Sequence, residues 1–256
     1  MYHLLKLEFH RLFRSKTFYI CLAASLFMVF VSVLTNKLLF AAIDTDELGE
    51  AFGMAFEAPT ALSTFKGFGT AYLSMILAVF ITLFVTEDYS SNTIKNIYAK
   101  GYSRDLVFFA KFLSSLAASL IFIVASAILS LILGKAFFGE FGEAGHFFAG
   151  SVVATFFVLI AYHTVFFFIA ICMRKLGGAL SISLVGPTAL GLILSLISAA
   201  TSSKVDLTQY WLDGCLTKLA AFDVSGNVLA TAFIMGFCMI AGGLAIGFFA
   251  NRTKDQ

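Results

Sequence analysis

Charged residues are scarce in this chain, and their scarcity decides the class of protein. Only 12% of its 256 residues are charged, whereas 60% are hydrophobic and the mean hydropathy is +0.94. Soluble domains carry roughly 25% charged residues, and a soluble core of this size cannot enclose so much apolar surface. The composition therefore excludes an ordinary water-soluble globular protein and requires lipid to cover much of the chain.

Several motifs that carry chemistry are also missing. No pair among the four cysteines has Cys-x-x-Cys spacing, so we expect neither a metal site nor a structural disulfide. Without a Gly-x-x-x-x-Gly-Lys-Ser/Thr phosphate loop, the chain cannot bind and hydrolyse ATP in the usual way. No His-Glu-x-x-His pair is present, and no Ser or Cys nucleophile lies near a plausible base. We therefore predict a non-enzyme with no catalytic residue and no cofactor of its own.

Ionisable side chains are nearly absent from the middle of the apolar segments. No carboxylate lies deep in any of them, although proton- and sodium-coupled carriers usually need one there. His163 is the only ionisable group in mid-segment, and we expect it to pack or to bond between helices rather than to carry protons. A filter-like sequence between broken half-helices is missing too, which argues against a selective channel.

What the chain does contain is six long apolar segments. A helix needs about 20 residues to cross a hydrocarbon layer of ~30 Å, and each segment reaches that length. The strict alternation of barrel strands is not seen. The expected fold is an all-α membrane protein with a single transmembrane domain over residues 1–256. Its predicted spans cover about residues 17–40, 67–86, 107–133, 147–173, 176–200 and 226–250.

Basic residues indicate the orientation. If the N-terminus is cytoplasmic, 12 of the 17 Lys and Arg residues fall in cytoplasmic segments, and 10 of the 15 acidic residues fall outside. The positive-inside rule counts only the basic residues, so both termini are expected in the cytoplasm. The basic residues then mark topology, and the net charge of +2 predicts no nucleic-acid partner.

The first residues form an amphipathic pattern. Such a helix lies along a membrane surface with its basic face toward lipid phosphates, and we prefer this to a simple extension of the first span. The apolar positions of this predicted surface helix are Leu5, Phe9, Leu12 and Phe13, and its basic positions include Arg11 and Arg14.

Two further features lie near the other side of the membrane. Leu207, Trp211 and Leu219 fall at helical spacing just before the last span, which predicts an outer interfacial helix with the only tryptophan at the interface. Gly186 and Pro187 lie inside the fifth span, where proline removes a backbone hydrogen bond and kinks a helix. The kink is a candidate hinge, and mere packing is an equally good interpretation.

Residues 87–105 form a polar loop between two spans. Ser91 or Asn92 can cap a short helix, and Gly101 suits the left-handed turn that ends it. Between them, Ile94, Ile97 and Tyr98 form one apolar stripe, which is typical of a helix inserted into a partner groove.

This loop resembles the first cytoplasmic loop of bacterial type-2 ABC transporter permeases, including members that protect against antimicrobial peptides and lantibiotics. The resemblance rests on an acidic residue closing a span, a Thr-Ile-Lys-Asn-Ile run, a Gly-x-Ser-Arg run and a basic residue entering the next span. The residues that carry this pattern, and to which it implies an ATPase-coupling role, are Glu87, Asp88, Thr93, Ile94, Lys95, Asn96, Ile97, Tyr98, Gly101, Ser103 and Arg104, followed by Lys111.

The resemblance implies partners and a location. Such permeases pair with a second permease, identical or a sister chain, in the bacterial cytoplasmic membrane. Two separate ABC ATPase subunits bind the ATP and Mg. The family also implies that the surface helix touches the ATPase and that outer re-entrant helices close the exit.

The resulting hypothesis is a subunit of an ATP-driven exporter for an amphipathic or hydrophobic cargo, either an antimicrobial peptide or a lipid-like molecule. In it, Glu87 and Asp88 bond the neighbouring loop or basic groups of the ATPase, and Lys95 and Arg104 pair with its acids. The apolar stripe fills a groove on the ATPase. The alternatives are a non-transporting immunity or signalling subunit and an ion-coupled secondary transporter.

Overall fold

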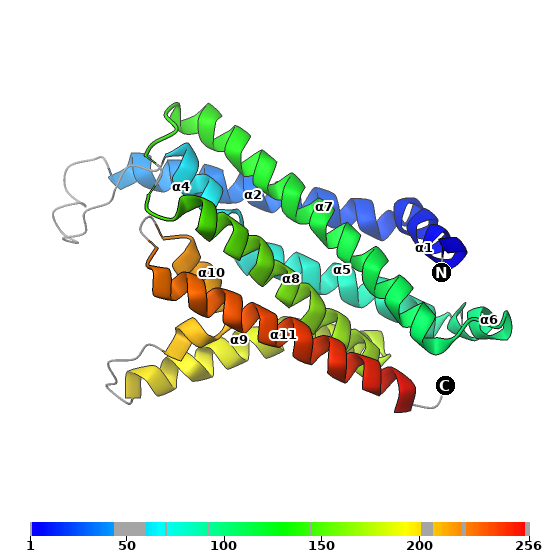
Figure 1. The fold of residues 1–256 in the computed structure, drawn as a ribbon. Coiled ribbons are helices and arrows are strands. Elements are labelled where there is room, and N and C mark those ends of the chain that lie inside the picture. Colours follow the sequence, from blue (N-terminus) through cyan, green and yellow to red (C-terminus); the bar gives the residue numbers. More distant parts are fainter. Residues whose placement is uncertain are drawn as a thin grey trace.

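The chain folds as a bundle of helices, seen along its length in Figure 1. A computed structural model describes residues 2–43, 60–69, 71–91, 93–143, 145–200, 207–221 and 224–253, and no strand occurs among them. The helices are α1 (Tyr2–Arg14), α2 (Lys16–Ile43), α4 (Ala61–Lys66), η1 (Gly67–Gly69), α5 (Ala71–Ser90), α6 (Thr93–Ala99), α7 (Arg104–Phe138), α8 (Phe148–Met173), α9 (Leu176–Ala200), η2 (Leu207–Tyr210), α10 (Leu212–Leu219) and α11 (Gly226–Thr253).

Six helical segments are long and apolar enough to cross a membrane, which confirms the predicted number. The second of them joins α4, η1 and α5 into one segment of 30 residues. The six segments are Lys16–Ala41, Ala61–Ser90, Arg104–Phe138, Phe148–Met173, Leu176–Ala200 and Gly226–Arg252.

Helix α8 lies at the centre of the bundle. It contacts α5, α7, α9, α10 and α11, and more than half of its most apolar stretch is buried. Helices α9 and α11 are covered least, with 11% and 17% of their most apolar stretches buried. Large apolar side chains such as Leu192, Leu196 and Phe249 therefore stay exposed, as expected of surfaces that lipid covers.

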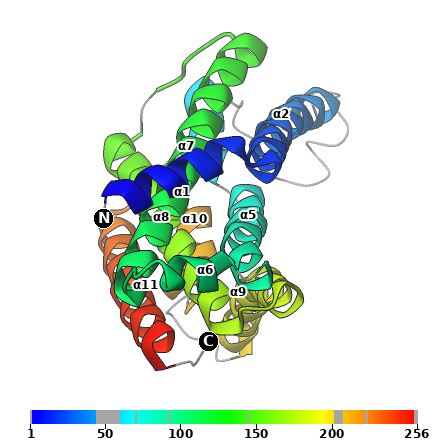
Figure 2. The ribbon, with the colours of Figure 1, turned by 90° about the vertical axis from the view of Figure 1, so that its right-hand side faces the viewer.

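The two ends of the bundle carry different short elements. Helices α1 and α6 and the C-terminal end of α11 lie at one end, which we call the α1/α6 end, while α4 and α10 lie at the other, the α4/α10 end (Figure 1). Seen from the α1/α6 end, α1 runs across the bundle and meets α2 at Ser15, rather than continuing along it (Figure 2).

Small residues allow α4 to approach α7 closely at the α4/α10 end. A Cβ atom on Gly134 would lie 3.0 Å from the Cα of Ala61, closer than side chains normally pack. Nearby, the Ser130 hydroxyl donates a hydrogen bond of 2.9 Å to the carbonyl of Thr64. Helix α7 thus holds α4 against the bundle by a close contact and a hydrogen bond.

Candidate functional site

A buried cluster of four charged side chains joins α1, α5 and α7 at the α1/α6 end. Asp88, near the end of α5, is 0% exposed and pairs with both Arg11 of α1 and Lys111 of α7. Glu8 of α1 is also 0% exposed, and its Oε1 lies 4.0 Å from the Lys111 Nζ. We call Glu8, Arg11, Asp88 and Lys111 the charge cluster. It balances two acids against two bases and ties three helices together. Glu8, Asp88 and Lys111 are fully buried, whereas the Arg11 side chain is 29% exposed.

The periodicity of α1 explains how this cluster is built. Leu4, Glu8 and Leu12 recur every four residues and are all buried, so they share the face that packs on the bundle. Arg11 lies three residues after Glu8, near enough on the helix surface to reach the same centre. The apolar face was predicted correctly at Leu12, but Phe13 is 47% exposed and the buried face includes the acid Glu8. Leu5 and Phe9 are half-buried, and Arg14 is exposed.

The apolar stripe of α6 packs against the chain itself. Ile97 is 7% exposed and lies in a cluster with Leu4 of α1 and with Val107 and Ala110 of α7. Ile94 is also buried, at 3% exposure. The hypothesis that these two isoleucines fill a groove on a partner is wrong for this arrangement, because their own chain already covers them. A periodic stripe shows that a face is covered but does not say what covers it.

The remaining loop residues divide between exposed and half-buried positions. Gly101 has φ = 85°, so the left-handed turn predicted after the loop helix is confirmed. Ser103 accepts a hydrogen bond of 3.4 Å from the Leu106 N–H and caps α7. The exposed loop residues include Glu87, Asn96, Lys100, Gly101, Ser103 and Arg104. Thr93 and Tyr98 are half-buried, and the Lys95 side chain and Asn92 lie outside the described part.

The loop's two acids therefore face different surroundings. Glu87 is exposed and lines a groove beside α1 and the start of α2. Asp88 points into the bundle, where it forms ion pairs with Arg11 and Lys111. The prediction that Asp88 contacts an ATPase directly is wrong, because its side chain is buried. A direct contact of Glu87 with an ATPase stays a prediction.

A second contact at this end joins α7 to α11, and no pattern in the sequence predicts it. The Arg252 Nε donates a hydrogen bond of 3.1 Å to Asp105 Oδ1, and the other oxygen of this carboxylate also pairs with the Arg252 guanidinium. The Asn251 amide donates to the Arg104 carbonyl at 3.3 Å. Asn251 and Arg252 thus lie beside the end of the polar loop of residues 87–105.

His163 bridges α8 and α7 in mid-bundle. Its Nδ1 lies 2.9 Å from the Ser119 hydroxyl and its Nε2 lies 3.4 Å from the Ser115 hydroxyl. Both serines are buried, as is the imidazole. The predicted bond between helices is confirmed, and its partners are hydroxyls rather than acids.

At the α4/α10 end, the predicted outer helix is broken into two pieces. Trp211 lies between η2 and α10, with extended backbone at φ = −125° and ψ = 150°. Its indole N–H donates a hydrogen bond of 2.9 Å to the carbonyl of Pro187, and the Tyr162 hydroxyl of α8 donates to the Asp213 carboxylate of α10. Leu219 is buried and Leu207 half-buried. The residues between 207 and 219 therefore dock onto α8, α9 and α11, and their position at the membrane interface stays a prediction.

Pro187 lies inside α9 without ending it. Its side chain is buried, and its carbonyl accepts the Trp211 indole hydrogen bond. Gly186 is half-buried, and a Cβ atom there would meet only Ile182 of its own helix, at 3.8 Å. These contacts give Pro187 a packing role, and a hinge stays a prediction.

Cys215 of α10 is one of four free thiols. Its Sγ donates to the Gln209 carbonyl at 3.0 Å, and burial raises the pKa of the thiol to about 11. The protonated thiol packs as a small side chain.

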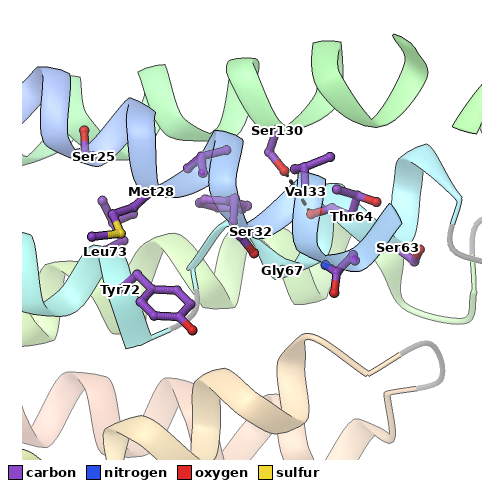
Figure 3. Close-up of a pocket in the computed structure, with 13 residues that line it drawn as sticks. Ser25, Met28, Ser32, Val33, Ser63, Thr64, Gly67, Tyr72, Leu73 and Ser130 are labelled. Carbon is purple, nitrogen blue, oxygen red and sulfur yellow. Dashed lines mark hydrogen bonds between the residues drawn. The ribbon is translucent and has the colours of Figure 1, made fainter. Parts of the chain in front are cut away.

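A small cavity lined with hydroxyl groups opens between α2, α4 and the start of α5 (Figure 3). Its volume is about 110 Å³, and Ser32, Thr64 and Ser130 are among its lining residues. Single serines and threonines scattered over three apolar segments gave no recognisable motif, so the sequence did not predict this cavity.

The sequence family described as "ABC-2 family transporter protein" matches residues 4–198. This chain belongs to the ABC-2 transporter family. No curated protein and no solved structure gives a significant match. The matched range holds the whole charge cluster, α6, the first four spans and the fifth span up to residue 198, while α10 and α11 lie beyond it.

Membership and fold together assign a coarse role. An ABC-2 transporter chain with six spanning segments is a multi-pass membrane protein, and such chains act as membrane subunits of ABC transporters, with ATP hydrolysed by a partner.

Proposed function

We propose that this chain is the transmembrane subunit of an ATP-driven exporter in the bacterial cytoplasmic membrane, with the α1/α6 end facing the cytoplasm. Two ABC ATPase subunits bind ATP and Mg and dock there, and a second permease, identical or a sister chain, completes the pathway. The observation that carries this proposal is the joint packing of α6, α1 and α7 beside the charge cluster.

The packing suggests how a push on α6 would reach the membrane. Ile97 rests on Leu4 of α1 and Val107 of α7, so α6 cannot shift without pressing on both helices. The Asp88 ion pairs then tie those helices to the end of α5. The four elements move together, so the end of spanning helix α5 and the start of spanning helix α7 receive the displacement.

The surface that remains for the ATPase is polar. Asn96, Lys100 and Arg104 are exposed, and the last two are positive. An ATPase surface carrying acids would complement them, as charged interfaces set docking orientation and rate. The sequence predicted that the isoleucines of α6 insert into the ATPase. We propose instead that the ATPase contacts the charged face of this segment, while the buried isoleucines support that face from within the chain.

Charge reversal on this face tests the proposal. A Lys100→Glu/Arg104→Glu variant should lose co-purification with the co-expressed candidate ATPase and its stimulation of ATP hydrolysis. The matched control is Lys175→Glu, an exposed cation in the turn between α8 and α9. Unchanged assembly and hydrolysis in the double variant, or equal loss in the control, would contradict the docking surface.

The cargo proposed is an amphipathic or hydrophobic molecule, an antimicrobial peptide or a lipid. Two features support it: large exposed apolar faces on α9 and α11, and hydroxyl groups lining a small cavity. Cells lacking the chain should become more sensitive to peptides of one class, and a partner ATPase that binds but cannot hydrolyse ATP should not restore resistance. Restored resistance would instead indicate a non-transporting immunity subunit.

A further inference from the structure

A groove of about 500 Å³ lies where α1 meets α2, beside the last turns of α5. Its wall holds His10 and Arg14 from α1, Lys16 from the start of α2, and Phe84 and Glu87 from α5. Arg11 lines it as well, but its guanidinium is paired with Asp88. The groove is thus separate from the exposed face of α6 to which we assign ATPase docking.

The charge of this groove favours an anion. Arg14 and Lys16 supply two permanent positive charges, Glu87 supplies the single negative one, and His10 adds a positive charge when it is protonated. Within the described part of the chain, neither Arg14 nor Lys16 takes part in an ion pair. A phosphate group has enough acceptor oxygens to bind the planar Arg14 fork and the Lys16 ammonium together.

The position of the groove favours a lipid as the source of that phosphate. Lys16 is the first residue of a spanning segment, so it lies where headgroups meet the hydrocarbon layer. Farther along α2, within its next turn, Tyr19 is 54% and Ile20 is 67% exposed. A cytosolic protein could not cover these side chains without entering the hydrocarbon layer, whereas the acyl chains of a lipid cover them naturally.

We propose that this groove binds the headgroup of an anionic phospholipid, with its phosphate between Arg14 and Lys16 and its acyl chains along Tyr19 and Ile20. Phe13, which is 47% exposed, lies between Leu12 and Arg14 on α1 and packs edge-on against Phe18 of α2. The aromatic pair stiffens the junction that forms the groove. Because Arg11 also belongs to the charge cluster, bound lipid would steady α1 in the position that the cluster requires.

Lipid quenching of a tryptophan placed beside the groove tests this proposal. The reporter is Tyr19→Trp in a Trp211→Phe background, which leaves one tryptophan in the chain. The protein is reconstituted in phosphatidylcholine bilayers that contain increasing fractions of brominated phosphatidylglycerol or, in parallel, brominated phosphatidylcholine. Half-maximal quenching should need a several-fold lower fraction of the brominated anionic lipid.

Charge removal supplies the matched comparison. An Arg14→Gln/Lys16→Gln pair in the reporter background should bring the two half-maximal fractions together. Lys37→Gln/Lys135→Gln, which removes two exposed cations of α2 and α7 near the other end, should leave the preference intact. Far-UV circular dichroism checks that each variant stays helical.

Three results would overturn the proposal. One is equal quenching by both lipids in the reporter protein, and another is an undiminished preference in the Arg14 and Lys16 variant. The third is loss of the preference on adding millimolar inorganic phosphate, which would show a site for free phosphate. Loss of ATPase co-purification in that variant, with its lipid preference unchanged, would identify a protein contact instead. The quenching needs no ATPase, so its failure would leave the exporter proposal standing.

Discussion

Asp88 shows how one buried residue can govern a junction of three helices. Removing one partner of a buried ion pair leaves the other charge uncompensated, at a cost of about 3–5 kcal/mol. In Asp88→Asn, both Arg11 and Lys111 lose their paired carboxylate. We expect the purified protein to unfold thermally at a markedly lower temperature.

The neighbouring acid provides the control for that measurement. Glu87 has the same charge and lies on the same helix, but it is exposed. Glu87→Gln should change the unfolding temperature little, since exposed charges contribute about 0–1 kcal/mol. Equal shifts for the two variants would show that the charge cluster does not hold the junction.

At the scale of elements, the hydrogen bond of Trp211 attaches η2 and α10 to α9. Its indole donates to a carbonyl inside a helix that proline already interrupts, and the Asp213 contact with Tyr162 holds α10 to α8 from another side. A Trp211→Phe variant keeps an aromatic ring but loses the donor. The loss of such a bond is worth about 1 kcal/mol.

Hydrogen exchange of the α10 backbone measures this loosening. We expect the amides of residues 212–219 to exchange roughly fivefold faster in Trp211→Phe, since 1.4 kcal/mol corresponds to about tenfold in an equilibrium constant. Tyr210→Phe, one residue earlier and exposed, should leave exchange unchanged. Unaltered exchange in both variants would contradict an anchoring role for the indole.

The sequence predicted elements better than their contacts. Length and hydropathy suffice for six spans, because each satisfies its own backbone bonds and needs only apolar surroundings. The apolar face of α6 was found as well, from the spacing of Ile94 and Ile97. Periodicity could not reveal that α1 and α7 cover it, since Leu4 and Val107 lie elsewhere in the chain.

The polar contacts of Asp88 and Trp211 could not be predicted from local sequence patterns either. A carboxylate at the end of a span indicates a water-exposed position until its partners are known, and Arg11 and Lys111 belong to different helices. The spacing of Leu207, Trp211 and Leu219 predicted one continuous helix. Tertiary hydrogen bonding of the indole to α9 outweighs that local pattern, and the helix breaks at Trp211.

At the scale of the whole molecule, the placement of the two ends predicts topology. Lys100 directly follows α6, and Lys135 lies near the end of α7, and both are exposed. Helix α6 lies at the α1/α6 end, and α7 runs from there to the opposite end of the bundle (Figure 1). Cysteines introduced singly at these positions should react differently with a membrane-impermeant maleimide. We expect Lys135→Cys to be labelled in intact cells and Lys100→Cys only after the membrane is opened.

The four native cysteines set the background of this labelling experiment. Cys21 and Cys215 are buried, and the parent chain labelled in parallel accounts for all four. The reverse labelling pattern would place the loop outside the cell and would remove the basis for ATPase docking there. Labelling of both positions in intact cells would mean that the cells leak.

The pairing of Arg252 with Asp105 has a practical consequence for anyone handling this protein. It holds the C-terminal end of α11 next to the loop to which we assign ATPase docking, and α1 lies at the same end of the bundle. A bulky fluorescent protein attached beside the end of α11 or the start of α1 would therefore obstruct that docking surface. Cells that express such a fusion should show normal fluorescence but no export. A small epitope inserted far from the α1/α6 end is the safer label.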